Sequence, residues 1–185
     1  SGGGALMSGN KAYCDHALFL ATQARDKAPH YQHSHIGYNY RMSNISAGIG
    51  RGQMEVIRER VNKRRENFFF YKQALGGFEE IAFLEEPTAD YFSNHWLTTL
   101  VINSDTNKNE DLRAYLQQYQ IETRPLWKPM HLQPVFSGTP AYTDGTSEDL
   151  FNKVICLPSS SNLQYEPRQF IVDKIIALFE RTEEV

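Results

Sequence analysis

One long amphipathic helix constrains this chain more than any other feature of its sequence. Between residues 44 and 75 apolar side chains recur at helical spacing, and charged residues crowd the opposite face. Ser43 or Asn44 can cap its start, and Gly76-Gly77 can stop it. The stripe comprises Ile45, Ile49, Ile57, Val61, Phe68, Tyr71 and Leu75.

Three glycines near the start of this helix work against it. Gly48, Gly50 and Gly52 should each cost about 1 kcal/mol of helix stability relative to alanine. We therefore expect another backbone to pack closely there, or a large group to need the space.

Shorter elements flank the long helix. The apolar spacing between Asn10 and about Gln23 predicts a helix with Asn10 as its N-cap, followed by a loop over 25–43. After Gly77, β-rich segments predict strands, and helical spacing returns twice. The expected elements are strands 81–84, 96–103, 121–123 and 154–157, a helix over 111–119, a terminal helix with Pro167 in its first turn, a polar turn at 105–109 and a loop at 137–147.

This order predicts an α/β (α+β) fold. A short, mainly antiparallel sheet would carry helices on one face, and the long helix would connect this small domain to something larger. Two leading helices and a long loop are typical of the tail of a larger protein rather than of a complete one.

Composition excludes several function classes. The net charge is -3, which gives no global field to recruit nucleic acid or an anionic membrane. No run of eighteen apolar residues suggests a membrane span. Cys14 and Cys156 fit no zinc spacing and suggest reduced thiols in a cytoplasmic protein.

The first candidate site is the polar and aromatic stretch 33–41, directly before the long helix. Free N–H groups and the helix dipole favour an anion at such a place. The alternative is a well hydrogen-bonded loop. The nearby His30, His33 and His35 lack the helical spacing of a zinc pair, so we expect no metal.

The second candidate is the proline-stiffened segment 122–131. It presents Arg124, Trp127, Lys128 and His131, and arginine suits phosphate or carboxylate while tryptophan offers a flat face for a ring. The alternative is a surface turn with a buried tryptophan.

The third candidate, 58–72, interleaves basic and aromatic residues, which can indicate nucleic acid. Phe68 and Tyr71 continue the core stripe, however, and glutamates offset the arginines through i, i+4 pairs. We therefore expect a solvated helix face.

Several motifs together resemble one family. Residues 37–45, GYNYRMSNI, precede a long helix with Gly52-Gln53 and Arg64-Arg65, and this pattern resembles the DegT/DnrJ/EryC1/StrS aminotransferases. These are fold-type I enzymes dependent on pyridoxal phosphate (PLP). Residues 1–26 are similar to the segment after the family's lysine strand, and residues 154–163 with the helix that follows fit its C-terminus. Residues 121–136 resemble its substrate-side loop, in the branch that makes UDP-4-amino sugars such as the bacillosamine precursor.

The resemblance implies a domain plan and a function. Residues 1–43 would be a remnant of the large PLP-binding domain, 44–77 the connecting helix, and 78–185 the small C-terminal domain. The parent would be a homodimer with shared active sites. It would transfer an amino group from glutamate to a nucleotide-linked keto sugar, for surface-polysaccharide or glycan biosynthesis.

The resemblance also implies roles for individual residues. Asn39 would reach the PLP phosphate of the partner subunit, with Tyr38 supporting it. Substrate contact falls to Arg41, Arg124, Trp127 and His131, and His33 and His35 are secondary candidates.

One departure from the family matters. Its Schiff-base lysine precedes the Ser-Gly-Gly-Gly turn at which this sequence starts, so no catalytic lysine is assigned, and we expect the chain alone to be inactive. The missing position leaves open a PLP-dependent sugar dehydratase of the same fold, in which histidine replaces that lysine. A non-catalytic dimerisation module is the alternative from another class.

Overall fold

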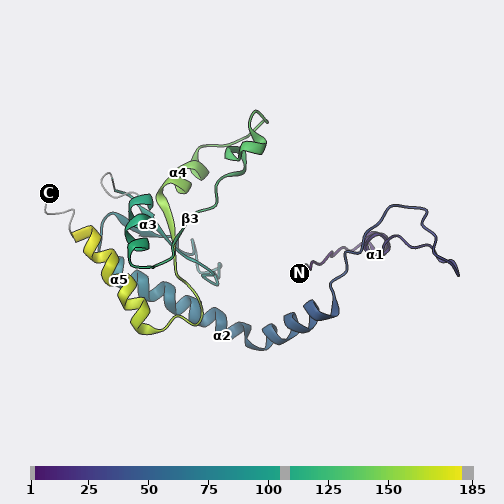
Figure 1. Cartoon of the computed structure of the whole chain (residues 1–185), viewed down its shortest axis with the longest axis horizontal. Helices are drawn as coiled ribbons and strands as arrows, with labels where there is room; N and C mark the ends of the chain where they lie inside the picture. The colour runs from purple at the N-terminus through teal and green to yellow at the C-terminus, as the bar shows by residue number, and fades with distance from the viewer. Residues whose placement is uncertain (1–2, 105–108, 181–185) are drawn as a thin grey trace. The chain divides into compact units, whose positions relative to one another are not determined.

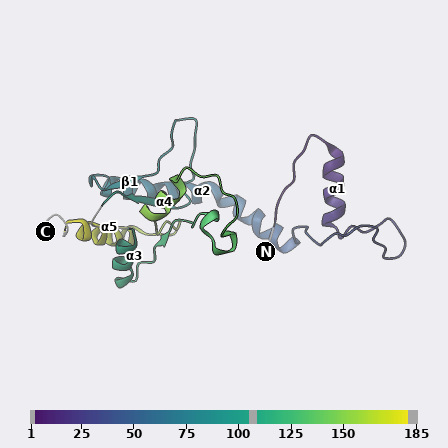
Figure 2. The same cartoon turned by 90° about the horizontal axis from the view of Figure 1, so that it is seen from above.

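The computed structural model describes residues 3–104 and 109–180, which fall into two compact units. These are Ser1–Ile57 and Arg58–Val185, and the division lies within helix α2 (Asn44–Leu75). Figures 1 and 2 show the helices and strands, coloured from purple at the N-terminus to yellow at the C-terminus. The expected polar turn at 105–109 lies outside the described residues, apart from Asn109.

In the first unit, helix α1 (Lys11–Ala21) begins as predicted. The side chain of Asn10 accepts a hydrogen bond from the Ala12 amide at 3.0 Å, which confirms the N-cap. The loop that follows returns to the end of α1, where the Tyr38 amide donates to the Leu20 carbonyl at 3.0 Å. A Cβ on Gly37 would lie 2.6 Å from the backbone nitrogen of Ala24, so this close approach requires glycine.

Helix α2 also has the expected ends. Ser43 accepts a hydrogen bond from the Ser46 amide at 3.1 Å, and the Gly76 amide donates to the Lys72 carbonyl just after the last helical turn. Only part of its apolar stripe is buried, however. Phe68, Tyr71 and Leu75 are buried, whereas the stripe residues at 45 and 49 are exposed. The helix therefore contributes to a core only in its second half.

The glycines of α2 have no near neighbour in the described chain. No heavy atom of another segment lies within 4 Å of a Cβ built on Gly48, Gly50 or Gly52. The close backbone packing expected there is thus not made by the residues that the structure describes.

The second unit contains a four-stranded sheet in the order β1-β2-β4-β3, with every neighbouring pair antiparallel. The strands are β1 (Ile81–Phe83), β2 (Thr98–Ile102), β3 (Arg124–Pro125) and β4 (Val154–Leu157). This confirms the predicted antiparallel sheet.

Strand β3 lies three residues later than the 121–123 predicted for it. The Ile121 amide still donates to the Leu116 carbonyl, and Gln120 has a φ of 60°, so this stretch closes the preceding helix. The chain becomes free to pair with β4 only at Arg124, opposite Cys156.

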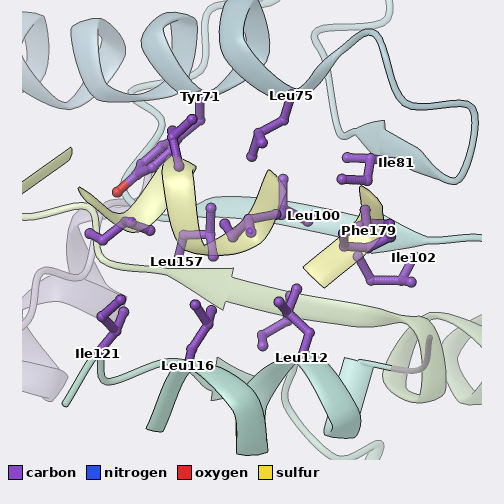
Figure 3. Close-up of a cluster of buried hydrophobic side chains, with 14 residues drawn as sticks. Tyr71, Leu75, Ile81, Leu100, Ile102, Leu112, Leu116, Ile121, Leu157 and Phe179 are labelled. Atoms are coloured by element: carbon purple, nitrogen blue, oxygen red, sulfur yellow. The ribbon is translucent and has the colours of Figure 1, made fainter. Parts of the chain in front are cut away.

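Helices α2, α3 (Asn109–Gln118) and α5 (Tyr165–Glu180) pack their apolar residues against the sheet. Side chains alternate along β2, so Leu100 and Ile102 share one face, and they join Leu112 of α3 and Phe179 of α5 in a single core. Figure 3 shows these side chains pointing toward one another. The predicted α+β arrangement is confirmed.

The predicted loop at 137–147 is followed by an element that the sequence analysis missed. Helix α4 (Thr146–Lys153) begins where Asp144 accepts a hydrogen bond from the Thr146 amide at 3.0 Å, and it leads directly into β4. Two 3-10 turns, η1 (Met130–Leu132) and η2 (Pro134–Phe136), lie between β3 and α4. Helix α4 is too short for a clear apolar period, which explains the omission.

Among the described residues, no helix combines the length and the apolar character that crossing a bilayer requires.

Candidate functional site

The predicted site residues are distributed over both units. Tyr38, Asn39 and Arg41 belong to the first unit, and Arg124, Trp127 and His131 belong to the second.

The backbone of residues 38–40 is fixed while its side chains remain open. Asn39 forms an isolated antiparallel bridge with Thr22, and the Tyr40 amide donates to the Ala21 carbonyl at 3.0 Å. The rings of Tyr38 and Tyr40 stack with centroids 5.3 Å apart, and both rings are exposed. Asn39 and Arg41 are exposed as well, so a fixed backbone presents an amide and a guanidinium to a ligand.

The histidines of this unit serve the loop itself. Nδ1 of His33 lies 2.9 Å from the Gln23 carbonyl oxygen, and the His35 ring packs edge-on against Phe19 at 5.7 Å. The Ser34 hydroxyl, and after it the Gln32 amide, lower the pKa of the Asp26 carboxyl. Within the described residues, no group of three or more His, Cys, Asp or Glu side chains could hold a metal ion.

The second unit contains a cleft of about 830 Å³, here called the tryptophan cleft. Trp96 and Trp127 form one wall, with ring centroids 5.9 Å apart and an interplanar angle of 26°. Trp127 is 64% exposed, so the alternative of a buried tryptophan is wrong. The other lining residues include Glu122, Arg124, Leu157, Ser159 and Phe170.

Of the three predicted residues in this unit, the cleft brings together Arg124 and Trp127. Both Nε and Nη2 of Arg124 donate to Oε1 of Glu122, at 3.0 and 2.7 Å. Both side chains are more than 70% exposed, so solvent screens this ion pair strongly. A ligand anion at the rim could therefore share the guanidinium with Glu122.

His131 does not line the tryptophan cleft. Its Nε2 lies 2.6 Å from Oε1 of Glu148, at the start of α4, and both side chains are partly buried. The pKa of Glu148 is lowered, first by a backbone hydrogen bond and then by the His131 ring. The pair joins η1 to α4, a contact that could not be foreseen while α4 itself was missed.

Trp96 is the cleft residue that sequence reasoning missed, because its position at the edge of a predicted strand suggested no chemistry. Nη1 of Arg64, on α2, donates to the carbonyl oxygens of Trp96 and Ser159, at 2.5 and 3.0 Å. The preceding residue, His95, has a φ of 43° and stacks on Phe68 with centroids 3.7 Å apart.

The segment 58–72 therefore differs in part from the expected solvated face. The predicted core positions Phe68 and Tyr71 are buried, and Glu59 pairs with Lys63 on the surface as an i, i+4 pair. Arg64 and Arg65 are half-buried and bind backbone carbonyls of the second unit. These two arginines therefore have a structural role, because they hold the segments around Ser93, Trp96 and Ser159.

Comparison with known protein families gives a match along most of the chain. A model of the DegT/DnrJ/EryC1/StrS aminotransferase family matches residues 1–176. EpsN of Bacillus subtilis (strain 168), which carries the name of a pyridoxal phosphate-dependent aminotransferase, is 46% identical over 99% of this chain and 48% of its own length. GDP-perosamine synthase of Escherichia coli O157:H7 is 31% identical over 94% of this chain and 46% of its own length.

A solved structure shares the fold. The aminotransferase TlmJ from Streptoalloteichus hindustanus superposes with a TM-score of 0.83 at 18% identity, over 95% of this chain and 47% of that one. At such low identity the likeness concerns the fold alone. The chain spans about half the length of the curated relatives that it matches.

Proposed function

Because this chain belongs to the DegT/DnrJ/EryC1/StrS aminotransferase family, we propose that its parent protein transfers an amino group from glutamate to a nucleotide-linked keto sugar. The observation that carries the proposal is the family match over residues 1–176, together with a relative that covers 99% of the chain. The name of the Escherichia coli relative supports a nucleotide-linked sugar as the substrate class. The product would serve surface-polysaccharide or glycan biosynthesis, and the UDP-4-amino-sugar branch remains a prediction.

The cofactor of the proposed reaction is PLP, which supplies an electron sink next to the reacting carbon. Asn39 fits a role in holding its phosphate, because the side-chain amide is exposed on a backbone fixed by the Thr22 bridge. Tyr38 supports this position through its carbonyl, which accepts the Gln23 amide at 3.1 Å. We place the phosphate in the partner subunit's site, which makes the active unit a homodimer with shared sites.

The substrate side of the proposed site falls to four residues. Arg124 and Trp127 line the tryptophan cleft and offer a cation and an aromatic face. Arg41 presents an exposed guanidinium next to the proposed phosphate site. His131 stays a predicted substrate contact, although its Nε2 already lies 2.6 Å from Oε1 of Glu148.

The proposed domain plan assigns residues 1–43 to a large PLP-binding domain, 44–77 to the connecting helix and 78–185 to the small domain. On this plan a lysine that precedes Ser1 in the parent holds the cofactor and moves the proton during transfer. The chain without that lysine would have no transaminase activity.

The test is to express the chain joined to its upstream coding sequence, add PLP, reduce with borohydride and digest for mass spectrometry. A pyridoxyl mass on a lysine a few residues before Ser1 is the expected result, and it does not depend on knowing the sugar. A matched control is this chain alone, for which we expect no stoichiometric adduct at the exposed Lys11 or Lys27. The absence of any adduct, with histidine at the upstream position, would overturn amino transfer and favour the dehydratase.

A further inference from the structure

The imidazole of His95 is a buried titratable group that the proposed reaction does not use. The residue is 5% exposed, and its ring stacks on Phe68 of α2 with centroids 3.7 Å apart and an interplanar angle of 10°. Its Nε2 atom has no hydrogen-bond partner among the residues that the structure describes. Burying a polar atom without a partner is costly, and burying a charge at the same place costs more.

The backbone at His95 has an unusual conformation. Its φ of 43° lies in the left-handed region, which residues other than glycine adopt at a cost and only where the surrounding structure fixes them. The His95 amide donates to the Ser93 hydroxyl at 3.1 Å, and the Trp96 amide donates to the side-chain oxygen of Asn94 at 3.0 Å. We call residues 93–96 the histidine turn. The contact of the ring with α2 helps to hold this turn in its strained conformation.

Three charged side chains act on the His95 ring, Arg65 from α2 and Glu85 and Glu86 from the segment after β1. Oε1 of Glu86 lies 3.7 Å from Nε2 of the ring, but this oxygen already accepts Nη1 of Arg65 at 2.7 Å and the Ser93 amide at 2.9 Å. A protonated ring would therefore compete with a guanidinium for one carboxylate oxygen. Burial is the largest influence on the pKa of the ring and lowers it, while Glu86, Arg65 and Glu85 in turn raise, lower and raise it.

The histidine turn leads directly into the tryptophan pair. Trp96 stacks on Trp127 with ring centroids 5.9 Å apart, and its carbonyl oxygen accepts Nη1 of Arg64 at 2.5 Å. The backbone angles at residue 95 set where Trp96 lies, because they are the only soft dihedrals between the two peptide planes. A change of φ at His95 would therefore move one wall of the tryptophan cleft.

We propose that His95 is a pH-sensitive latch on the tryptophan cleft. The neutral ring stacks on Phe68 and keeps the histidine turn in its left-handed conformation, which holds Trp96 against Trp127. The protonated ring leaves this stack for solvent, the turn relaxes, and the two tryptophans separate. This inference concerns regulation and goes beyond the proposed amino transfer, on which it does not depend.

The direction of the pH response follows from the state that binds the proton more tightly. In the closed latch the pKa of His95 lies below its ordinary 6.5, whereas in the open latch the ring is in solvent and titrates near that value. Above about pH 6.5 the closed state therefore keeps its full stability. Below this pH the ratio of closed to open molecules falls by up to about tenfold per pH unit, until the pH reaches the lower pKa of the closed state.

Acrylamide quenching of tryptophan fluorescence measures the state of the latch. The chain contains two tryptophans, and both belong to the stacked pair, so the signal comes from this pair alone. We would follow the quenching constant from about pH 8 to about pH 5.5, with far-UV circular dichroism as the check that the chain stays folded. The constant should rise below about pH 6.5 and return on neutralisation, while the dichroism stays the same.

Two substitutions assign the transition to one histidine. Asparagine takes up no proton and tolerates a positive φ, so His95→Asn should give a quenching constant that does not change with pH. His131→Asn, at the other histidine of the second unit, is the matched control and should keep the rise at acidic pH. A rise that persists in His95→Asn, or one that disappears in His131→Asn, would overturn the proposal.

Hydrogen exchange decides the case in which His95→Asn does not fold. In the wild-type chain, amides of the histidine turn should lose protection between about pH 7.5 and about pH 5.5 after correction for the intrinsic exchange rate, whereas those of β2 should keep it. Unchanged protection of the turn, or a wild-type quenching constant that is the same at both pH values, would refute the latch. Neither measurement requires PLP or a sugar, so such a result leaves the proposed function intact.

Discussion

His95 combines burial, an aromatic neighbour and an unusual backbone conformation. The residue is 5% exposed, its ring stacks on Phe68, and its Nε2 has no hydrogen-bond partner in the described chain. Burial lowers the pKa of the ring below its ordinary 6.5, an effect that Glu86 opposes from 3.7 Å. Arg65, which binds Glu86, lowers the pKa of His95 further.

This arrangement makes stability depend on pH. Because the folded pKa of His95 is depressed, the unfolded chain takes up a proton first, and the unfolding free energy should fall as pH drops below about 6.5, by at most about 1.4 kcal/mol per pH unit. His95→Asn should remove this slope between pH 7.5 and 5.5, since asparagine tolerates the positive φ. Urea denaturation at pH 7.5 and at pH 5.5 measures this change in unfolding free energy.

The control for this prediction is His16→Asn, at an exposed position, which should keep the slope. Glu86 does not contribute in this window. The Arg65 guanidinium lowers its pKa below the ordinary 4.5, so its contribution is lost only as pH falls through that lower value. An unchanged slope in His95→Asn would contradict the assignment.

The His131–Glu148 pair permits a second prediction at this scale. A double-mutant cycle of His131→Ala and Glu148→Ala should give a larger favourable coupling free energy than the exposed Arg124–Glu122 pair, because the bond is short and both side chains are partly buried. The matched control is the Arg124–Glu122 pair, whose exposed cycle should give less than about 0.5 kcal/mol. Equal couplings measured by urea denaturation would contradict this account of burial.

At the scale of elements, α2 does more than cover the sheet. Three side chains spaced along one of its faces donate to consecutive carbonyls after β4, with Tyr71 binding Pro158 at 3.0 Å. Asn67 binds the Ser160 carbonyl at 2.9 Å and accepts from Arg168 of α5 at 3.1 Å, and Arg64 binds Ser159. One face of α2 therefore holds the turn that borders the tryptophan cleft.

Asn67 is the central member of this row, and it is 2% exposed. Asn67→Ala would leave the Ser160 carbonyl and the Arg168 guanidinium without their partner, so we expect a loss of about 1–3 kcal/mol in unfolding free energy. Asn62→Ala, on the exposed face of the same helix, should change stability by less than about 0.5 kcal/mol. Equal effects of the two substitutions in urea would refute the proposed role of this row.

At the scale of the whole molecule, the first half of α2 differs from the second. Ile45 and Ile49 are 77% and 62% exposed, and the three glycines between residues 48 and 52 have open space around them. The relatives are about twice as long as this chain, and the proposed domain plan adds a large domain to the parent. We propose that this half of the helix is covered in the parent.

Gly50→Ala tests this proposal. In the present chain it should stabilise α2 by about 1 kcal/mol, since nothing obstructs the added methyl group, and helix content by circular dichroism should rise or hold to a higher temperature. In the full-length parent the same change should lower the melting temperature or the dimer fraction, if a close surface meets the glycine. Stabilisation in both contexts would show that this face stays open.

Much of the fold follows from short-range features that are visible in the sequence. Asn10 and Ser43 cap the two leading helices because each side chain bonds an amide within three residues, and the periods of α2 and β2 depend only on the chain's own geometry. The motif around Asn39 and the segment around Trp127 could likewise be assigned to one family from the sequence, because their residue types occur in a specific order.

Only the tertiary structure decided which residues meet. Trp96 stacks on Trp127, Arg64 binds the turn after β4, and Glu148 joins His131, all through contacts between segments far apart in the chain. Local periodicity contains no information on such pairs, because they depend on strand order and on how helices pack on the sheet. The sequence by itself determined the long helix, the sheet type and the family, whereas helix α4, the position of β3 and the pairing of Trp96 with Trp127 were decided by the tertiary structure.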